Sequence, residues 1–352
     1  MASGRRASPV EVIKNRAKKV LSRVGFRLER ISDEELLLQK GYDPRHPPPS
    51  SDLPYLSPGN PALLTLEQSY GNDPSPVGAR SLWAQAMQTS VDDLRFFRGD
   101  NLYLWQYTRS PLLNQYRYFI YGRYVQSIDE RGMLTTLKED GAFGCLTFKF
   151  HDMPTLSRDL LDSVNELTFL ADHAGLFSRP ALHILDIGAG YGRLAHRALE
   201  ASSDIQQYSC IDAIPRSTFL CEYYLRYRGL AERTSVIRLP DMSDALEPGQ
   251  IDLAVNIHSF SEMPHAAVAG WLGWLADLRV PQLLIVPNER DRLLSHEGDG
   301  VRRDCTELLN RAGYTLQVSQ PTIQDGAIRG LLDVHDHFML YRLAGATGQL
   351  SR

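Results

Sequence analysis

From residue 182 onward, short apolar runs alternate with longer stretches of helical period. Five of these runs are nearly continuous in apolar residues: 182–187, 208–212, 234–239, 251–257 and 282–287. Such runs are typical of strands buried on both faces, as in a parallel sheet flanked by helices. Two further segments, 314–319 and 335–343, are expected to close one edge of the sheet. The pattern predicts an α/β fold with a mostly parallel sheet.

The part of the chain before this region has a different pattern of apolar and polar residues. Residues 80–178 are predicted to be mainly helical, and apolar residues recur at helical spacing through 155–176, with a stop signal at Gly175. Ten aromatic residues lie between Phe96 and Tyr124. Most are expected in the core, although tyrosine hydroxyls also suit the polar edge of a sugar or polyketide. We interpret 80–178 as a helical lid and acceptor-binding region.

The N-terminal segment, residues 1–79, combines a basic helix with a proline-rich arm. A helix is predicted over 10–30, and prolines favour an extended chain over 43–61. The helix is expected to be docked or frayed, with a membrane-surface or partner-binding helix as the alternative. Residues 179–352 then form a separate domain that contains the sheet.

Composition excludes several classes of protein. The chain has 352 residues, 43% of them hydrophobic, which suits one large domain or two smaller ones. A net charge of −4 argues against a generically basic nucleic-acid binder. Four cysteines without CxxC spacing do not form a disulfide framework, so a reducing cytoplasm is expected. The sequence has no apolar run of about 18 residues, so no transmembrane segment is expected.

The sharpest chemical signal is LDIGAGYGRLA, residues 185–195. A predicted strand ends there, glycines follow at 188, 190 and 192, and a helix is expected from Arg193. Glycines allow a tight turn and a close approach of the backbone to a ligand. The spacing differs from the dinucleotide pattern GxGxxG, because the third glycine comes one residue early. No Gly-Lys-Ser/Thr follows, which excludes a P-loop.

Two acidic residues indicate which ligand this loop binds. Asp186 precedes the first glycine by two residues, where a carboxylate would repel a pyrophosphate and attract a cationic amine. Asp212 ends the next strand, where it can accept hydrogen bonds from both hydroxyls of a ribose. S-adenosylmethionine (SAM) has an ammonium group, a carboxylate and a ribose, and therefore fits both acids and the loop amides.

The combination D-x-G-x-G-x-G, strand, acid resembles the signature of class I SAM-dependent methyltransferases. That resemblance implies a Rossmann-like α/β fold with a seven-stranded, mostly parallel sheet, and SAM as the cofactor. Asp241 and Met242 follow the third strand and are adenine candidates, although Asp241 could instead cap a helix. Asn256 closes the fourth strand, near the expected position of the methyl group. The predicted cofactor residues are Asp186, Gly188, Ala189, Gly190, Asp212, Ala213, Asp241, Met242 and Asn256.

The segment NIHSFSEMP, residues 256–264, lies where this fold places acceptor chemistry. It lacks both an Asn/Asp-Pro-Pro-Tyr/Phe pattern and a nucleophilic cysteine, which argues against a nucleic-acid substrate. His258 and Glu262 are spaced i, i+4 and would share a face if the segment is helical. A hydroxyl has a pKa far above neutrality, so a base that takes up its proton favours methyl transfer to the oxygen. Histidine titrates near neutral pH and can act as this base.

We therefore predict His258 as general base, with Glu262 orienting it, binding a sugar hydroxyl or holding a divalent metal. A hydrogen-bonded structural histidine is the alternative for His258. His335 and His337 are weaker candidates, expected on one face of a strand.

Further acceptor contacts are predicted in the helical region. The candidates are Trp105, Tyr107, Tyr116, Asn165 and Glu166, with Arg158 on the same helix as the last two. The residues of that helix could reach the methionine end of SAM or the substrate, or could have surface or capping roles.

The runs SRDLLDSVNELTFL, IDAIPRSTFLCEYYL and NIHSFSEM, together with the glycine loop, resemble the sugar O-methyltransferases of bacterial natural-product and surface-glycan gene clusters. The likeness covers about 80–343. It implies methylation of a hydroxyl on a small-molecule sugar or glycoside. Mg²⁺ is allowed but not indicated, and a homo-oligomer is left open. The alternatives are a non-sugar hydroxyl or carboxyl of a secondary metabolite as acceptor, a SAM-binding enzyme that catalyses a non-methylating reaction, and a non-catalytic interaction module.

Overall fold

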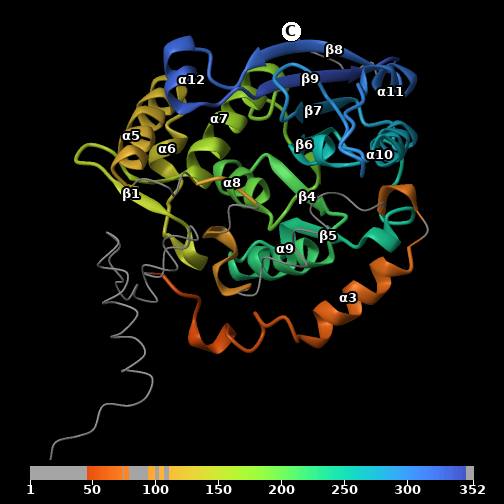
Figure 1. Cartoon of the computed structure of the whole chain (residues 1–352), viewed down its shortest axis with the longest axis horizontal. Helices are drawn as coiled ribbons and strands as arrows, with labels where there is room; N and C mark the ends of the chain where they lie inside the picture. The colour runs from red at the N-terminus through yellow and green to blue at the C-terminus, as the bar shows by residue number, and fades with distance from the viewer. Residues whose placement is uncertain (1–45, 74, 79–93, 100–102, 107–110, 346–352) are drawn as a thin grey trace, which may run out of the picture.

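The computed structural model describes residues 46–73, 75–78, 94–99, 103–106 and 111–345. Figure 1 shows the chain with its elements labelled. The basic helix predicted over 10–30 lies outside the described residues, as does Tyr107.

A seven-stranded sheet forms the centre of the molecule, in the order β5-β4-β3-β6-β7-β9-β8. All strand pairs are parallel except those of β9, which runs antiparallel to β7 and to β8. The strands are β3 (Leu182–Ile187), β4 (Ile205–Ile211), β5 (Thr234–Ile237), β6 (Leu253–Ile257), β7 (Gln282–Val286), β8 (Tyr314–Pro321) and β9 (His337–Leu343). The predicted Rossmann-like α/β fold with a seven-stranded, mostly parallel sheet is confirmed.

The central strand β3 is buried at every position because helices cover both faces of the sheet. Its successive side chains enter two different hydrophobic clusters. The covering helices are α7 (Arg158–His173), α8 (Arg193–Ala201), α9 (Pro215–Tyr227), α10 (His265–Asp277) and α11 (Thr306–Arg311). Leu185 belongs to the same cluster as Trp271 of α10, whereas Ile184 belongs to the cluster that contains Leu161 of α7 and Leu194 of α8. A strand with apolar residues on both faces therefore has a partner for each.

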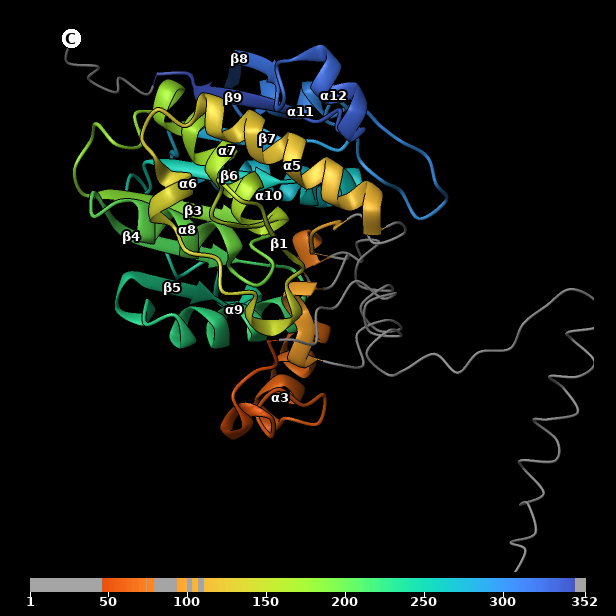
Figure 2. The same cartoon turned by 90° about the vertical axis from the view of Figure 1, so that its left-hand side faces the viewer.

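The helical region before the sheet consists of several short elements. They are η3 (Leu94–Gly99), α5 (Pro111–Ile128), α6 (Met133–Thr136) and η4 (Ala142–Gly144). α5 and α6 lie beside α7 (Figure 2). The described part of 80–178 is mainly helical, as predicted, but it also contains an unpredicted hairpin of β1 (Thr147–Lys149) and β2 (Thr155–Ser157).

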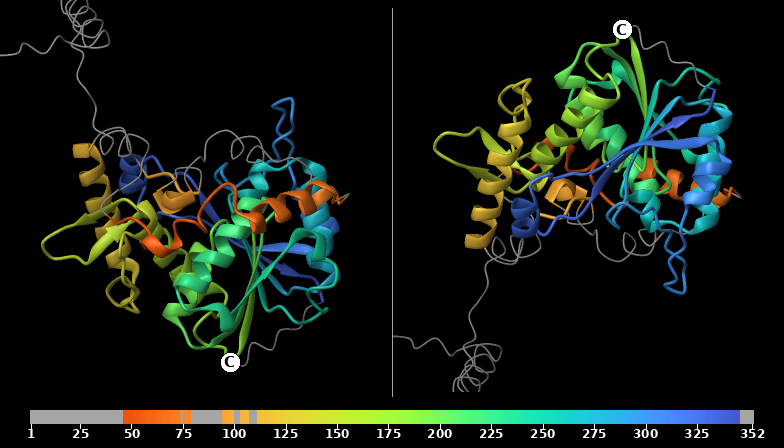
Figure 3. Two further views of the ribbon diagram at one scale, coloured as in Figure 1. Left: turned by 90° about the horizontal axis from the view of Figure 1, so that it is seen from below. Right: turned by 90° about the horizontal axis from the view of Figure 1, so that it is seen from above.

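The proline-rich arm is docked on the sheet domain. It contains the short helix η1 (Ser50–Asp52), and Tyr55 stacks on Phe219 of α9 with ring centroids 5.0 Å apart. The arm continues into the unpredicted helix α3 (Pro61–Gly71) and the short η2 (Pro76–Gly78), and α3 packs on α9. Figure 3 shows this orange segment against the sheet domain. The division of the chain at 79 and 178 stays a prediction.

A buried ionic network joins the helical region to the sheet domain. Arg98 of η3 and Arg197 of α8 both contact Glu139 and Asp159, with shortest N···O distances of 2.7–3.1 Å. All four side chains are inaccessible or nearly so. Although burial alone would raise the pKa of Asp159, Arg197 and Arg98 hold it well below its usual range. Two cations and two carboxylates thus compensate one another in the interior.

Candidate functional site

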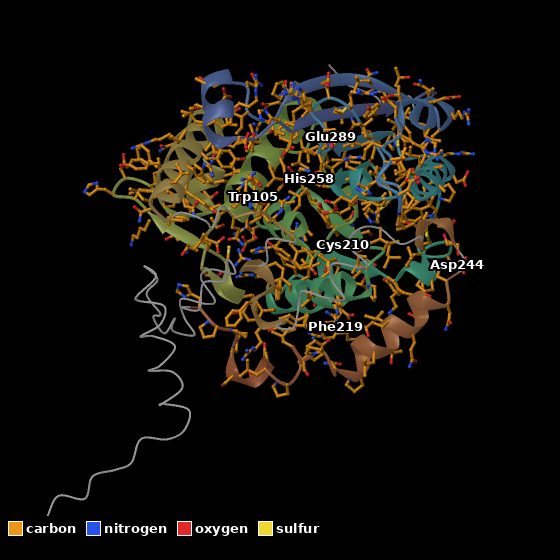
Figure 4. The ribbon with its side chains drawn as sticks, in the orientation of Figure 1. Trp105, Cys210, Phe219, Asp244, His258 and Glu289 are labelled. Carbon is orange, nitrogen blue, oxygen red and sulfur yellow. The ribbon has the colours of Figure 1, made fainter. Side chains whose placement is uncertain are left out.

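A cavity of about 360 Å³ opens at the carboxyl ends of β3, β4 and β6. The strand order reverses between β3 and its neighbour β6, which is the place where open α/β sheets bind ligands. The cavity lining also includes segment 103–105 from the helical region and loop 333–336 before β9. Trp105 and His258, both labelled in Figure 4, line this cavity.

The glycine loop has the predicted course from strand to helix, since α8 begins at Arg193. Gly188, Gly190 and Gly192 have φ of 74°, 59° and 85°, a region that other residues rarely adopt. Protein atoms occupy the space beside these glycines. A Cβ at 188 would lie 2.1 Å from the Ser259 hydroxyl, and one at 190 would lie 3.1 Å from the Tyr103 ring. Backbone conformation and packing against protein therefore both require glycine here.

The two predicted cofactor acids lie in the cavity with Gly188, Ala189, Gly190 and Ala213. Asp186 accepts a hydrogen bond from the Tyr208 hydroxyl at 3.2 Å. Asp212 accepts from the backbone amides of Gly190 at 2.9 Å and Ile214 at 2.8 Å. Burial raises the pKa of each carboxyl to about 7. The site thus contains two acids that a bound cation would help to ionise.

Helix α7 supports the glycine loop from behind through Asp159, Ser163 and Glu166, spaced i, i+4, i+7. The Tyr191 hydroxyl donates to Asp159 at 2.7 Å. Arg193 donates to the Ser163 hydroxyl at 2.9 Å and to both oxygens of Glu166 at 2.8 and 2.9 Å. Glu166, a predicted substrate contact, lies in an adjoining cavity of about 20 Å³ and outside the main cavity.

A second set of polar side chains on α7 lines the two cavities. Arg158 donates through Nε to both oxygens of Asp162, at 2.7 and 2.8 Å, and both residues line the main cavity. Asn165 donates to the Thr322 carbonyl at 2.9 Å and lines only the smaller cavity.

His258 directly follows β6 and has an unusual backbone conformation. Its φ of 65° and ψ of −36° lie outside the helical region, and the 3₁₀ helix η7 (Ser259–Glu262) begins after it. His258 and Glu262 therefore do not lie on one face of a single helix, as their spacing suggested. Both residues nevertheless line the cavity.

The carboxylate beside the imidazole is not the predicted one. Glu262 accepts from the Asn288 side chain at 3.3 Å, and burial raises its pKa to about 7. The Nε2 atom of His258 instead lies 4.0 Å from Oδ2 of Asp336. Asp336 belongs to the DVHDHF segment, residues 333–338, in which only the two histidines were predicted as candidates. Asn288 and Tyr103 also line the cavity, and neither was predicted as a site residue from the sequence.

The two histidines of that segment do not share a strand face, so this expectation was wrong. β9 begins at His337, whereas His335 precedes it. His335 lines the cavity and lies 3.2 Å from Asp333.

Several other predicted residues lie outside the lining of either cavity. Asp241 and Tyr116 are exposed, and Met242 packs against the core. Asn256 is fully buried; its side chain donates to the Ile187 carbonyl at 2.8 Å and accepts from the Phe260 amide at 3.0 Å. It connects the end of β6 to the glycine loop. Trp105, by contrast, lines the main cavity and is 52% exposed.

The residues that the structure describes contain no group of three or more His, Cys, Asp or Glu side chains placed to hold a metal ion. None of the helices within the described ranges is long and apolar enough to cross a bilayer.

The sheet order, with a single reversed strand at β9, defines a Rossmann-like α/β fold. No family model matches the chain, and no curated protein does. Among solved structures, mitomycin 7-O-methyltransferase MmcR is 21% identical over 52% of this chain, with a TM-score of 0.36; the chain spans 57% of its length. A Burkholderia thailandensis 1,6-didemethyltoxoflavin-N1-methyltransferase is 22% identical over 52% of this chain and 78% of its own (TM-score 0.37). The [4+2]-cyclase SpnF is 14% identical over 65% and 94% (TM-score 0.39). Similarities at this level carry no information about the reaction.

Proposed function

We propose that this protein is a SAM-dependent O-methyltransferase that acts on a hydroxyl of a sugar or glycosylated natural product. The observation that carries the proposal is the shared cavity. It combines a glycine loop, the buried acids Asp186 and Asp212, and a histidine at the end of β6. The loop and acids suit a cationic nucleoside, and the histidine suits a hydroxyl acceptor.

The residues of the cavity fit SAM in their chemistry. Asp186 would hold the ammonium group, and Asp212 would accept from the ribose hydroxyls, because each carboxylate oxygen has two lone pairs. Burial raises the pKa of both acids to about 7, and a cationic ligand favours their ionised forms. SAM supplies an already activated methyl group when bound.

The protein has three tasks in this reaction. His258 takes up the proton of the acceptor hydroxyl at its imidazole as the new C–O bond forms. Segment 103–105, which lines the cavity, orients the acceptor and excludes water from one side. Glu262, held by Asn288, offers a further polar contact. Trp105 presents an aromatic surface that suits the apolar face of a sugar.

The test is a screen of p-nitrophenyl hexosides and 6-deoxyhexosides with SAM, read by intact mass, with and without a chelator. The proposal requires a product heavier by one methylene group and stoichiometric S-adenosylhomocysteine. Calorimetry without heat for SAM and S-adenosylhomocysteine would refute the cofactor assignment. A transformed product without added methyl would favour the non-methylating alternative. A parallel panel contains non-sugar hydroxyl and carboxyl compounds. Methylation of these compounds alone would show that the acceptor is not a sugar.

A further inference from the structure

Two hydrogen-bond acceptors from distant parts of the chain lie close together in the cavity. His258 follows β6 and Asp336 precedes β9, and both line the cavity. The side chains are 35% and 26% exposed, so a ligand can reach both. Their Nε2 and Oδ2 atoms are 4.0 Å apart. This separation is too long for a direct hydrogen bond, but a ligand could contact both atoms.

The imidazole has one nitrogen that is open to a ligand. Nδ1 of His258 is buried and has no hydrogen-bond partner among the residues that the structure describes. Nε2 is therefore the nitrogen that can accept a proton from an acceptor hydroxyl. With the mobile proton on Nδ1, Nε2 is a hydrogen-bond acceptor, as is the Asp336 carboxylate.

Backbone contacts hold the two groups in place. The His258 amide donates to the Val286 carbonyl at 2.7 Å. The Asp336 carbonyl accepts from the amide of Thr322 at 2.9 Å and from its hydroxyl at 3.2 Å. Their spacing thus follows from strands β6, β7 and β8 rather than from the two side chains alone.

Neighbouring polar side chains already have partners. Asp162 is paired with Arg158, Asp333 with His335, and Glu262 with Asn288. The His258 imidazole and the Asp336 carboxylate, by contrast, both line the cavity and lie 4.0 Å apart without a hydrogen bond between them.

One hydroxyl has one proton and can donate to only one of these groups. Two hydroxyls on adjacent carbons can donate to both at once. We infer that the acceptor is a vicinal diol, whose reacting hydroxyl donates to Nε2 of His258 and whose neighbour donates to Asp336. This inference rests on the proposed function, and it narrows the acceptor from any hydroxyl to one with an adjacent hydroxyl.

The experiment compares each p-nitrophenyl glycoside that the wild-type enzyme methylates with its deoxy analogue that lacks the neighbouring hydroxyl. The wild type should prefer the diol by about 10–100-fold in kcat/KM, since the deoxy analogue lacks the hydroxyl that donates to Asp336. Asp336→Ala should lower kcat/KM for the diol by that factor and leave the deoxy analogue nearly unchanged. Asp336→Asn, which keeps the side-chain shape, should fall between the two.

Asp172→Asn is the matched control, because this carboxylate of α7 makes an exposed ion pair with Arg131. SAM calorimetry and thermal melts show that each variant is folded. An equal loss on diol and deoxy acceptors would overturn the inference and leave Asp336 as a group that acts through His258. An unchanged diol rate would also overturn it. A wild type that methylates no glycoside contradicts the proposed function, whereas methylation without a diol preference contradicts only the inference.

Discussion

The two ends of the cavity are built in different ways. The end that we assign to the cofactor comes from two consecutive strands, β3 and β4, with both acids buried and the loop supported by α7. The end that we assign to the acceptor comes from five segments: 103–105, 158–162, 257–263, 288 and 333–336. Its central side chains, His258 and Asp336, keep a quarter to a third of their exposure. A short local motif can build a rigid pocket for an invariant ligand, whereas a pocket assembled from loops can change with its substrate.

The largest effect is expected at the acceptor end. His258→Ala should lower turnover by roughly 10²–10⁴-fold, because it removes the base, and should leave SAM affinity unchanged. Initial rates and calorimetry on one preparation measure both. Near-normal turnover would show that His258 is structural, and a joint loss of turnover and SAM binding would show that the two ends are not separable.

The support behind the glycine loop can be tested through stability. Asp159→Ala should lower the free energy of unfolding by about 3–5 kcal/mol, since Arg98 and Arg197 would lose a buried counter-ion. Denaturant unfolding provides the measurement. Asp172→Ala, the same change at an exposed position on α7, is the control and should stay close to the wild type. Similar losses in the two variants would contradict the importance of the buried network.

The cofactor end can also be tested residue by residue. Asp212→Ala should weaken SAM binding by about 1–3 kcal/mol through lost ribose hydrogen bonds. Asp241→Ala should change it little, because Asp241 lies outside the cavity lining. Titration calorimetry of the two variants with SAM tests whether Asp241 contacts the adenine, as the sequence predicted. A comparable loss for Asp241→Ala would restore the adenine assignment.

The smallest effect is a pH dependence confined to the cofactor end. Asp186 and Asp212 have pKa values of about 7 in the folded protein, above their ordinary values. Folding without ligand is therefore favoured at low pH, and this contribution is lost as the pH rises through about 7. A cation binds the ionised acids, so SAM affinity should rise from about pH 6 to 8, by about tenfold per group that must ionise. Calorimetry across this range, with Asp212→Asn reducing the slope, checks the sign; a flat profile contradicts it.

Local sequence patterns were sufficient for the core of the fold. All five apolar runs and both of the expected edge segments contain strands, and the glycine loop leads into a helix at Arg193. α7 ends at His173, just before Gly175, which has a φ of 73°. These features depend on hydrophobic period and on backbone conformations that glycine alone adopts easily. The β1–β2 hairpin and α3 were not predicted, and α3 packs on α9, a segment far away in the sequence.

The candidate site also contains residues that local sequence predicted and residues that only the tertiary structure brought together. Asp186 and Asp212 could be predicted from the sequence. Asp186 lies near the end of one strand and Asp212 directly follows the next, and neighbouring parallel strands end at the same edge of the sheet. Asp336 and Asn288 could not be predicted, since they approach His258 and Glu262 only after β6, β7 and β9 pair. The spacing of His258 and Glu262 was also misleading, because a positive φ at His258 separates it from the helix that follows.

The order of residues was therefore enough to specify the sheet, its glycine turn and the two acids beside it, because each depends on neighbours within one strand and one loop. Pairing of remote strands was needed to place Asp336 at 4.0 Å from His258, and packing of helices was needed to bury Arg98 and Arg197 against Asp159. Such contacts carry no local signature, since the energy that forms them arises when segments far apart in the chain exclude water together.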